Sequence, residues 1–346
     1  MCNILDIQSC SKLIKLILIQ WMITICLSGC HYQRECLISG RTMGTSYHIK
    51  YNVGLLFDHQ DLKNEITRTL QDINHSMSTY DAESEISVFN QMNEIEKPLP
   101  ISDPFFQVMK QAQKLYQITN GAWDGTVKPI VNLWGFGHTK YQQQKPDDDQ
   151  IEQCLKQVGF QNIVITDHHL QKKIQNLELN LASIAKGFGV DQIARVLEKH
   201  GITNYLVEIG GEVFGKGTKI DGSPWRVGIN RPQIDASVHD VYLAISLHNK
   251  AIATSGDYRN YYIDGKHRYS HVINPKTGRP VSNGIVSVSV ISDQCTFADG
   301  LATALMVMGP ESGIQLVNDI SGTECLMIQE RATEYKLFYS DHFPRK

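Results

Sequence analysis

The chain has little of what a disulfide scaffold, a nucleic-acid-binding surface or a membrane-spanning helix requires. Only 8 of its 346 residues are Cys, and its 33 Lys+Arg against 36 Asp+Glu give a net charge of −3. This balance provides no electrostatic footprint for nucleic acid, so no such partner is expected. Apolar runs fall short of the roughly 20 residues that a confident membrane span needs. The remaining composition, with 42% hydrophobic residues, 26 Gly and 11 Pro, is typical of a turn-rich globular protein.

The N-terminal segment has the features of an export signal. Lys12 and Lys15 precede a short apolar stretch over residues 16–27, which ends in Leu-Ser-Gly before Cys30. A basic start, a short apolar middle and small residues at the end are typical of a signal peptide, and this ending resembles a bacterial lipobox. We therefore expect residues 1–29 to be removed and Cys30 to be lipidated, which would anchor the protein to a membrane of the cell envelope, facing the periplasm. An uncleaved anchor with an accidental Cys is the alternative.

Hydrophobic spacing and turn signals predict a mixture of helices and strands. The predicted helices include Leu62 to Ile73, Asp103 to about Gly121, about Ala185 to His200, and about Thr296 to Met308. The predicted strands are 162–166, 204–209, 225–230, 241–247, 285–292, 324–329 and 335–339. In the strand 285–292, β-branched residues alternate with serines, a pattern typical of a half-buried strand. The mixed order indicates an α+β fold with mixed and antiparallel sheets and packed helices, rather than a doubly wound sheet.

A first candidate site lies in Asn180 to Asp191. Strand-like residues 177–181 lead into small residues and then a helix that carries Lys186. Unpaired backbone N–H groups at a helix start, together with the helix dipole, bind phosphate readily. The alternative is a helix entry whose small residues serve close packing.

A second candidate site lies in Ser270 to Pro280. Two prolines, an Asn and a Gly within this span predict a tight and rigid turn, which holds His271 in one direction. Histidine is the side chain best suited to accept a proton near neutral pH. The alternative is a surface turn whose His is incidental.

A third candidate site is the pair Asp299 and Thr303. The two residues are four apart in a predicted helix, so their oxygens share one face. A carboxylate and a hydroxyl are suited to Mg²⁺ held jointly with a substrate phosphate. The alternative is an Asp favoured by the helix dipole and a Thr bonded within its own helix.

Other sequence patterns suggest a different enzyme class or simple loops. The segments Ser183 to Lys186, Tyr258 to Asn260 and Lys276 to Gly278 follow the motif order of penicillin-binding serine acyl transferases. However, the last motif lies between prolines, which fit a turn better than the strand that this motif occupies in those enzymes. The Gly-rich segment 210–217 lacks the spacing of a dinucleotide-binding loop and is interpreted as a hairpin turn, and residues 142–149 as a surface connection.

Taken together, these segments resemble the FAD:protein FMN transferase (ApbE) family of bacterial lipoproteins or periplasmic enzymes. The matching motifs occur in the family's order over most of the chain after Cys30. They are Met43-Gly44-Thr45, Ser78-Thr79-Tyr80, Ser84 to Asn90, Gly121 to Asp124, Val131 to Gly137, Ser183 to Gly187, Thr254 to Tyr258, His271 to Pro280 and Asp299 to Thr303. This number of motifs in the same order is specific for the family, although no single motif would be.

The resemblance implies a T-fold-like α+β flavin transferase domain that occupies residues 30–346. It implies Mg²⁺-dependent transfer of FMN from FAD to a Thr or Ser hydroxyl of a target protein, through a phosphoester bond and with release of AMP. Typical targets are membrane subunits of sodium-pumping NADH:quinone reductase or Rnf complexes. Two alternatives are left open: a lipoprotein that stores or hydrolyses FAD without transfer, and the serine acyl transferase above.

The resemblance also implies roles for individual residues. FAD is expected to contact Met43, Tyr80, Ala122, Trp123, Asp124, Asn180, Lys186 and Ile273. Mg²⁺ is expected at Asp299, the Thr303 hydroxyl and the Ser183 carbonyl, and His271 is expected to take the proton of the acceptor hydroxyl. The chain departs from the family at Asn180 and Asn274, where Asp is common. Asn keeps one hydrogen-bond acceptor but removes the negative charge. If the family's Asp acts as a base, the enzyme would be slower or differ in specificity. If the Asp only hydrogen-bonds the flavin or the turn backbone, little changes.

Overall fold

The computed structural model describes residues 33–137, 145–232, 241–257, 261–264, 267–331 and 334–345. The predicted signal peptide, Cys30, Gln142 to Gln144 and Tyr258 to Asn260 lie outside the described residues. In the described part of the chain, no helix has both the length and the apolar composition needed to cross a membrane.

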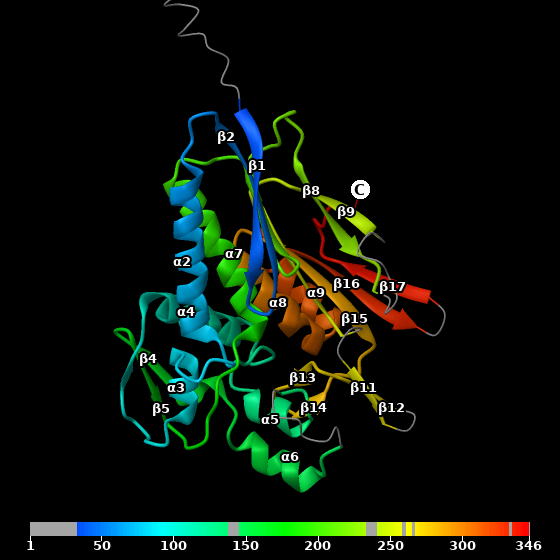
Figure 1. Cartoon of the computed structure of the whole chain (residues 1–346). Helices are drawn as coiled ribbons and strands as arrows, with labels where there is room; N and C mark the ends of the chain where they lie inside the picture. Colours follow the sequence, from blue (N-terminus) through cyan, green and yellow to red (C-terminus); the bar gives the residue numbers. More distant parts are fainter. Residues whose placement is uncertain are drawn as a thin grey trace, which may run out of the picture.

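Helices and strands alternate along the chain in mixed order (Figure 1). The helices are α2 (His59–Met77), α3 (Glu85–Gln91), α4 (Asp103–Ile118), α5 (Lys128–Leu133), α6 (Asp148–Leu155), α7 (Ala182–Lys199), α8 (Cys295–Met308) and α9 (Pro310–Asn318), with a 3₁₀ turn η1 (Phe160–Asn162). The strands are β1 (Gln33–Thr42), β2 (Thr45–Gly54), β3 (Leu99–Pro100), β4 (Ile163–Thr166), β5 (His169–Lys172), β6 (Tyr205–Ile209), β7 (Glu212–Lys216), β8 (Trp225–Asn230), β9 (Val241–Leu247), β10 (Lys250–Gly256), β11 (Tyr261–Asp264), β12 (His267–Ser270), β13 (Ile273–Asn274), β14 (Arg279–Pro280), β15 (Ile285–Ser292), β16 (Glu324–Arg331) and β17 (Glu334–Tyr339).

An antiparallel sheet forms the centre of the described structure. Its strand order is β1-β2-β6-β7-β10-β15-β16-β17, and its neighbouring strands all pair antiparallel. On one face, α7 packs against β6 and β7 while α8 packs against β10 and β15 (Figure 1). The α+β architecture with antiparallel sheets and packed helices that the sequence predicts is therefore confirmed.

The strand β15 is buried on both faces, so its expected half-buried character is wrong. All eight residues of β15 are buried. Val288 and Val290 join the core beneath the helices, whereas Val286 and Ile291 join a second cluster with residues of β8 and β9. The β8–β9 hairpin covers the outer face at this point, which local alternation along β15 does not reveal.

The four predicted helices and the seven predicted strands are confirmed, with small shifts at their ends, whereas the strand-like residues 177–181 form no strand. Leu62, Ile66, Leu70 and Ile73 are all buried on α2. The cap of α4 is Ser102 and not Asp103, because the Ser102 hydroxyl accepts the hydrogen bond from the Phe105 amide. The start of α2 is likewise set by a local cap, since the Asp58 side chain accepts from the Gln60 and Asp61 amides.

Two predicted loops are corrected in detail. The hairpin turn expected over 210–217 consists of Gly210 and Gly211 alone, both with positive φ (62° and 105°), and β7 follows directly. Of the connection expected over 142–149, the described residues 145–147 are irregular, and α6 begins at Asp148. The cap residue Asp147 forms a reciprocal capping box with Gln150. Both corrections follow from turn and cap chemistry that occupies only one or two residues.

Candidate functional site

The candidate site is a cavity of about 440 Å³ between the first half of α7, one face of α8, β10 and the segment that contains His271. Its walls come from segments that are distant in the chain. The lining residues are Tyr80, Ala122, Trp123, Asp124, Val127, Val131, Phe136, Asn180, Ala182, Ser183, Lys186, Glu212, Thr254, Ser255, Gly256, His271, Val272, Ile273, Pro275, Asp299, Thr303 and Val307. All of the site residues proposed from the sequence line this cavity, except Met43 and the undescribed Cys30.

Met43 lies in the two-residue turn between β1 and β2 and packs against α7. Its thioether end lies over Gly189, where an added Cβ would come within 3.0 Å of Met43 Cε. Met43 has a positive φ of 49°, and it contacts the hydrophobic core. Met43 is thus not part of the cavity lining, and its side chain packs against α7.

A close approach of α7 and α8 brings their polar groups together. At Gly187, an added Cβ would lie 2.4 Å from the Cys295 carbonyl oxygen and 2.9 Å from Asp299 Cβ, so only Gly fits. The Gly187 amide donates to Asp299 Oδ2 at 3.0 Å. This hydrogen bond ties the first half of α7 directly to the Asp299 side chain of α8.

Lys186 lies between two buried carboxylates. Its Nζ is 2.5 Å from Glu212 Oε1 and 3.9 Å from Asp299 Oδ1. Burial alone lowers the pKa of Lys186, but the two carboxylates outweigh burial and raise it above its ordinary value. Burial raises the pKa of Glu212 and of Asp299, and the Lys186 ammonium opposes this in both. A charged ammonium therefore lies in the cavity wall, where it suits a phosphate.

The oxygens near Asp299 fit a magnesium ion. Thr303 Oγ1 lies 3.0 Å from Ser255 Oγ, and both residues line the cavity together with Ser183 and Asp299. Carboxylate, hydroxyl and carbonyl oxygens are the hard ligands that Mg²⁺ prefers. The described residues include no cluster of three or more His, Cys, Asp or Glu that could hold a metal. A cation bound here would thus take its other ligands from water and from substrate phosphate, as Mg²⁺ commonly does.

The carboxylate of Asp124 bonds within its own loop and to the start of η1. Its Oδ1 accepts from the Thr126 amide at 2.8 Å and from the Thr126 hydroxyl at 2.6 Å, and Oδ2 accepts from the Phe160 amide. Burial raises the pKa of Asp124, and these hydrogen bonds oppose it. Trp123 donates its indole N–H to Ser183 Oγ at 3.0 Å. Asp124 therefore shapes the loop, and Ala122 and Trp123 present the loop's contact surface to the cavity.

Asn180 and Asn274 both bond to nearby backbone. Asn180 Oδ1 accepts from the Ala182 amide at 3.0 Å, at the start of α7. Asn274 Oδ1 accepts from the Lys276 amide at 2.9 Å, within the β13–β14 turn. An amide oxygen serves as well as a carboxylate in such turns, so this role survives the loss of charge.

The turn next to His271 is held by side-chain contacts with residues outside it. Trp134 donates its indole N–H to the Gly278 carbonyl at 2.7 Å. The His271 ring meets Phe136 edge-on, with the ring centroids 6.4 Å apart. The turn residues Lys276 to Gly278 join β13 to β14 and do not form the strand that a penicillin-binding enzyme requires. Lys186 pairs with Glu212, and Ser183 accepts from Trp123, so the acyl transferase reading is not supported.

Glu212 is a cavity residue that the sequence reasoning missed. It follows the Gly210-Gly211 turn, within a segment that was set aside as a hairpin. Its exposed fraction is only 3%, and its pairing with Lys186 joins β7 to α7. An acidic residue directly after two glycines was the available signal, but nothing in the sequence indicated that the hairpin would lie beside α7.

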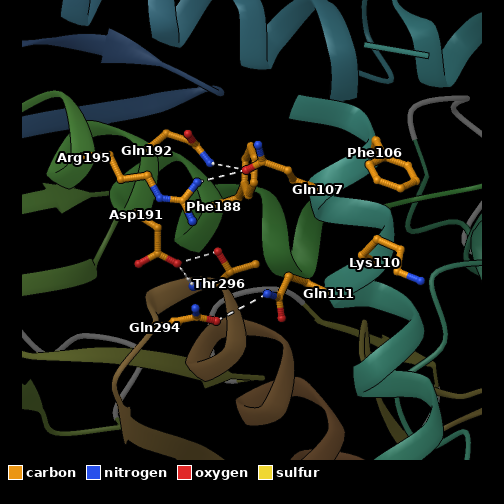
Figure 2. Close-up of a pocket in the computed structure, with 10 residues that line it drawn as sticks. All are labelled: Phe106, Gln107, Lys110, Gln111, Phe188, Asp191, Gln192, Arg195, Gln294 and Thr296. Atoms are coloured by element: carbon orange, nitrogen blue, oxygen red, sulfur yellow. Dashed lines mark hydrogen bonds between the residues drawn. The ribbon is translucent and has the colours of Figure 1, made fainter. Parts of the chain in front are cut away.

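A second cavity of about 410 Å³ lies between α4, α7 and the start of α8 (Figure 2). Figure 2 shows that Asp191 of α7 points toward Thr296 at the first turn of α8. Asp191 accepts from the amides of Cys295 and Thr296 and from the Thr296 hydroxyl, at 2.6 to 2.8 Å. The half-buried Asp191 carboxylate therefore caps the first turn of α8 and joins it to α7.

Known proteins resemble this chain along almost its entire length. Residues 43–327 match the ApbE family, a range that includes every residue lining the cavity. An FAD:protein FMN transferase of Vibrio cholerae is 43% identical over 331 residues, which cover 93% of this chain and 97% of that protein. One of Haemophilus influenzae is 39% identical over 297 residues, covering 84% and 86%. The structure of the flavin transferase ApbE from Vibrio cholerae superposes with a TM-score of 0.82 and 43% identity, covering 90% of this chain and 98% of that one.

Proposed function

The chain belongs to the ApbE family and is an FAD:protein FMN transferase, and from this we propose that it transfers FMN, with Mg²⁺, to a Thr or Ser hydroxyl of its target protein and releases AMP. The observation that carries the proposal is the convergence of His271, Lys186 and the oxygens of Asp299 and Thr303 on one cavity. Phosphoryl transfer depends mainly on positioning and on charge stabilisation, which such a cavity supplies.

Two residues contact the dinucleotide, Lys186 in the cavity wall and Tyr80 at the rim. Lys186, on α7, supplies a positive charge to the pyrophosphate from the cavity wall. The Ala182 amide at the start of α7 is already bonded to Asn180 Oδ1, and the Ile184 and Ala185 amides to the Leu181 carbonyl. Tyr80 is 82% exposed at the cavity rim and offers a flat ring for stacking. A bound Mg²⁺, held by Asp299, Thr303 and Ser183, would supply further neutralisation of the phosphate charge.

Transfer itself exchanges one phosphorus–oxygen bond for another. The acceptor hydroxyl oxygen forms a bond to the phosphorus of the FMN half, while the bond from that phosphorus to the bridging oxygen breaks. The bridging oxygen keeps the electron pair and leaves as part of AMP. His271 takes the proton of the acceptor hydroxyl, because it is the neutral-pH base held beside the cavity.

The test uses the purified protein with FAD, Mg²⁺ and an acceptor domain that contains the target Thr. We expect flavin fluorescence that stays on the acceptor through denaturing electrophoresis, an equal amount of AMP, and loss of both in EDTA. Asp299→Ala should lower the rate by orders of magnitude, and Thr303→Val should lower it less, because only the first removes the charge. Asp293→Ala, which changes an exposed Asp paired with Lys250, is the matched control. FAD binding without AMP release, with any acceptor or with water, would favour flavin storage instead.

We further propose that Cys30 is lipidated and that the protein acts at the periplasmic face of the envelope on a membrane acceptor. The support is the lipobox-like sequence before Cys30 and the family's typical targets, the flavinylated subunits of sodium-pumping NADH:quinone reductase or Rnf complexes. Cys30→Ser should leave a precursor longer by the signal segment, detected by mass spectrometry of the membrane fraction. A variant that is fully processed and still membrane-bound would contradict the anchor.

A further inference from the structure

Glu212 lies in the cavity wall without a part in the proposed transfer. Its side chain is 4% exposed, and Oε1 contacts the Lys186 ammonium at 2.5 Å. Its other oxygen, Oε2, is buried and has no hydrogen-bond partner among the described residues. A buried carboxylate with one unsatisfied oxygen depends strongly on its remaining contact. Lys186 is that contact.

Asp299 also lies near the Lys186 ammonium, but its carboxylate has another hydrogen-bond donor. Its Oδ2 already accepts the Gly187 amide. Its Oδ1 lies 3.9 Å from Lys186 Nζ, which is beyond hydrogen-bond length. Because Glu212 holds the ammonium at the shorter distance, Lys186 does not occupy the hydrogen-bonding position at Asp299 Oδ1.

The hairpin that carries Glu212 fits closely over the Lys186 side chain. A Cβ added to Gly210 would lie 3.1 Å from Lys186 Cδ and 2.8 Å from Thr45 Cγ2. The alkyl chain of Lys186 therefore runs beneath the turn toward Glu212. This contact is independent of the charges and fixes the direction in which the lysine extends.

We propose that Glu212 is a positioning residue, which holds Lys186 away from Asp299 so that one carboxylate oxygen of Asp299 stays available to a divalent cation. The inference rests on the cation site of the proposed function. Without Glu212, the ammonium would move onto Asp299 Oδ1 and compete with the cation. Groups that orient a metal ligand in this way commonly affect metal affinity by about 10- to 100-fold when they are changed.

The test measures binding of Mn²⁺ alone, from the electron paramagnetic resonance signal of the free ion, with Mg²⁺ as competitor and without FAD. Residues 30–346 with Cys30→Ser serve as the parent protein. Glu212→Gln should weaken Mn²⁺ binding by about 10-fold or more. In a Lys186→Met background, the same Glu212→Gln change should cost only a few-fold, because no ammonium remains to compete. Glu198→Gln is the matched control, since it removes the Glu198–Lys216 pair, which involves the same strand β7.

The cycle of single and double variants separates this role from its alternatives. If Glu212→Gln weakens binding by the same factor with and without Lys186, Glu212 acts only through its charge and the proposal is wrong. An unchanged affinity in Glu212→Gln would also overturn it. Circular dichroism checks that each variant is folded, and Lys186→Gln replaces Lys186→Met if that variant unfolds. FMN transfer is measured separately, so a failure of the transferase proposal with intact Mn²⁺ binding at Asp299 is recognisable.

Discussion

Lys186→Met is expected to destabilise the protein more than a surface lysine change would. The Lys186 side chain is 29% exposed, whereas those of Glu212 and Asp299 are 4% and 5% exposed. Removing the ammonium leaves two buried carboxylates without their cation. Breaking a buried pair by removing one partner typically costs about 3–5 kcal/mol. We expect the free energy of unfolding to fall within that range.

The double variant provides the sharper measurement. In Lys186→Met/Glu212→Gln, the unpaired carboxylate at 212 is replaced by a neutral amide, whose missing hydrogen bonds cost about 1–3 kcal/mol. The double variant should therefore be more stable than Lys186→Met alone. Urea unfolding followed by tryptophan fluorescence measures both, with Lys216→Met as the control at the more exposed pair with Glu198. A Lys186→Met variant as stable as the Lys216→Met control, or a double variant with the summed loss of its single changes, would refute the reasoning.

Three further predictions concern the packing, the chemistry and the pH dependence. Gly187→Ala should destabilise the protein by about 1–3 kcal/mol or more in urea unfolding, because the backbone carbonyl of Cys295 blocks the new methyl group. His271→Ala should abolish flavin labelling of the acceptor while FAD affinity, measured by flavin fluorescence, stays near that of the parent; normal labelling would place the base elsewhere. Burial raises the pKa of Asp257 to about 6, against the opposing Arg268. The folded state therefore holds this proton more tightly than the unfolded state, and the resulting stability, full below about pH 4, is lost as pH rises through about 6. Asp257→Asn should flatten that part of the stability–pH curve, and an unchanged curve would contradict it.

Much of the fold follows from local patterns in the sequence. The apolar spacing of α2 and the β-branched run of β15 each predict their element, because burying one face requires that spacing in a helix or strand. In the hairpin β1–β2, β1 is a largely exposed edge strand that offers no clear apolar pattern. The alternating Tyr47, Ile49, Tyr51 and Val53 of β2 are buried, so β2 carried a period-2 signal that was missed. The double burial of β15 depends on β8 and β9, which are far from it in the chain.

The sequence by itself determined the motifs and their order, and thereby the family, since Ser183, His271 and Asp299 each stand in a segment whose residue types suit one chemical task. Only the tertiary structure decided which of these groups meet. It placed Met43 against α7 outside the cavity lining, engaged the Asp124 carboxylate with Thr126 and Phe160, and brought Glu212 beside Lys186. The physical reason is that caps, turns and periodicity act over a few residues, whereas the close crossing of α7 and α8 at Gly187 joins segments more than a hundred residues apart.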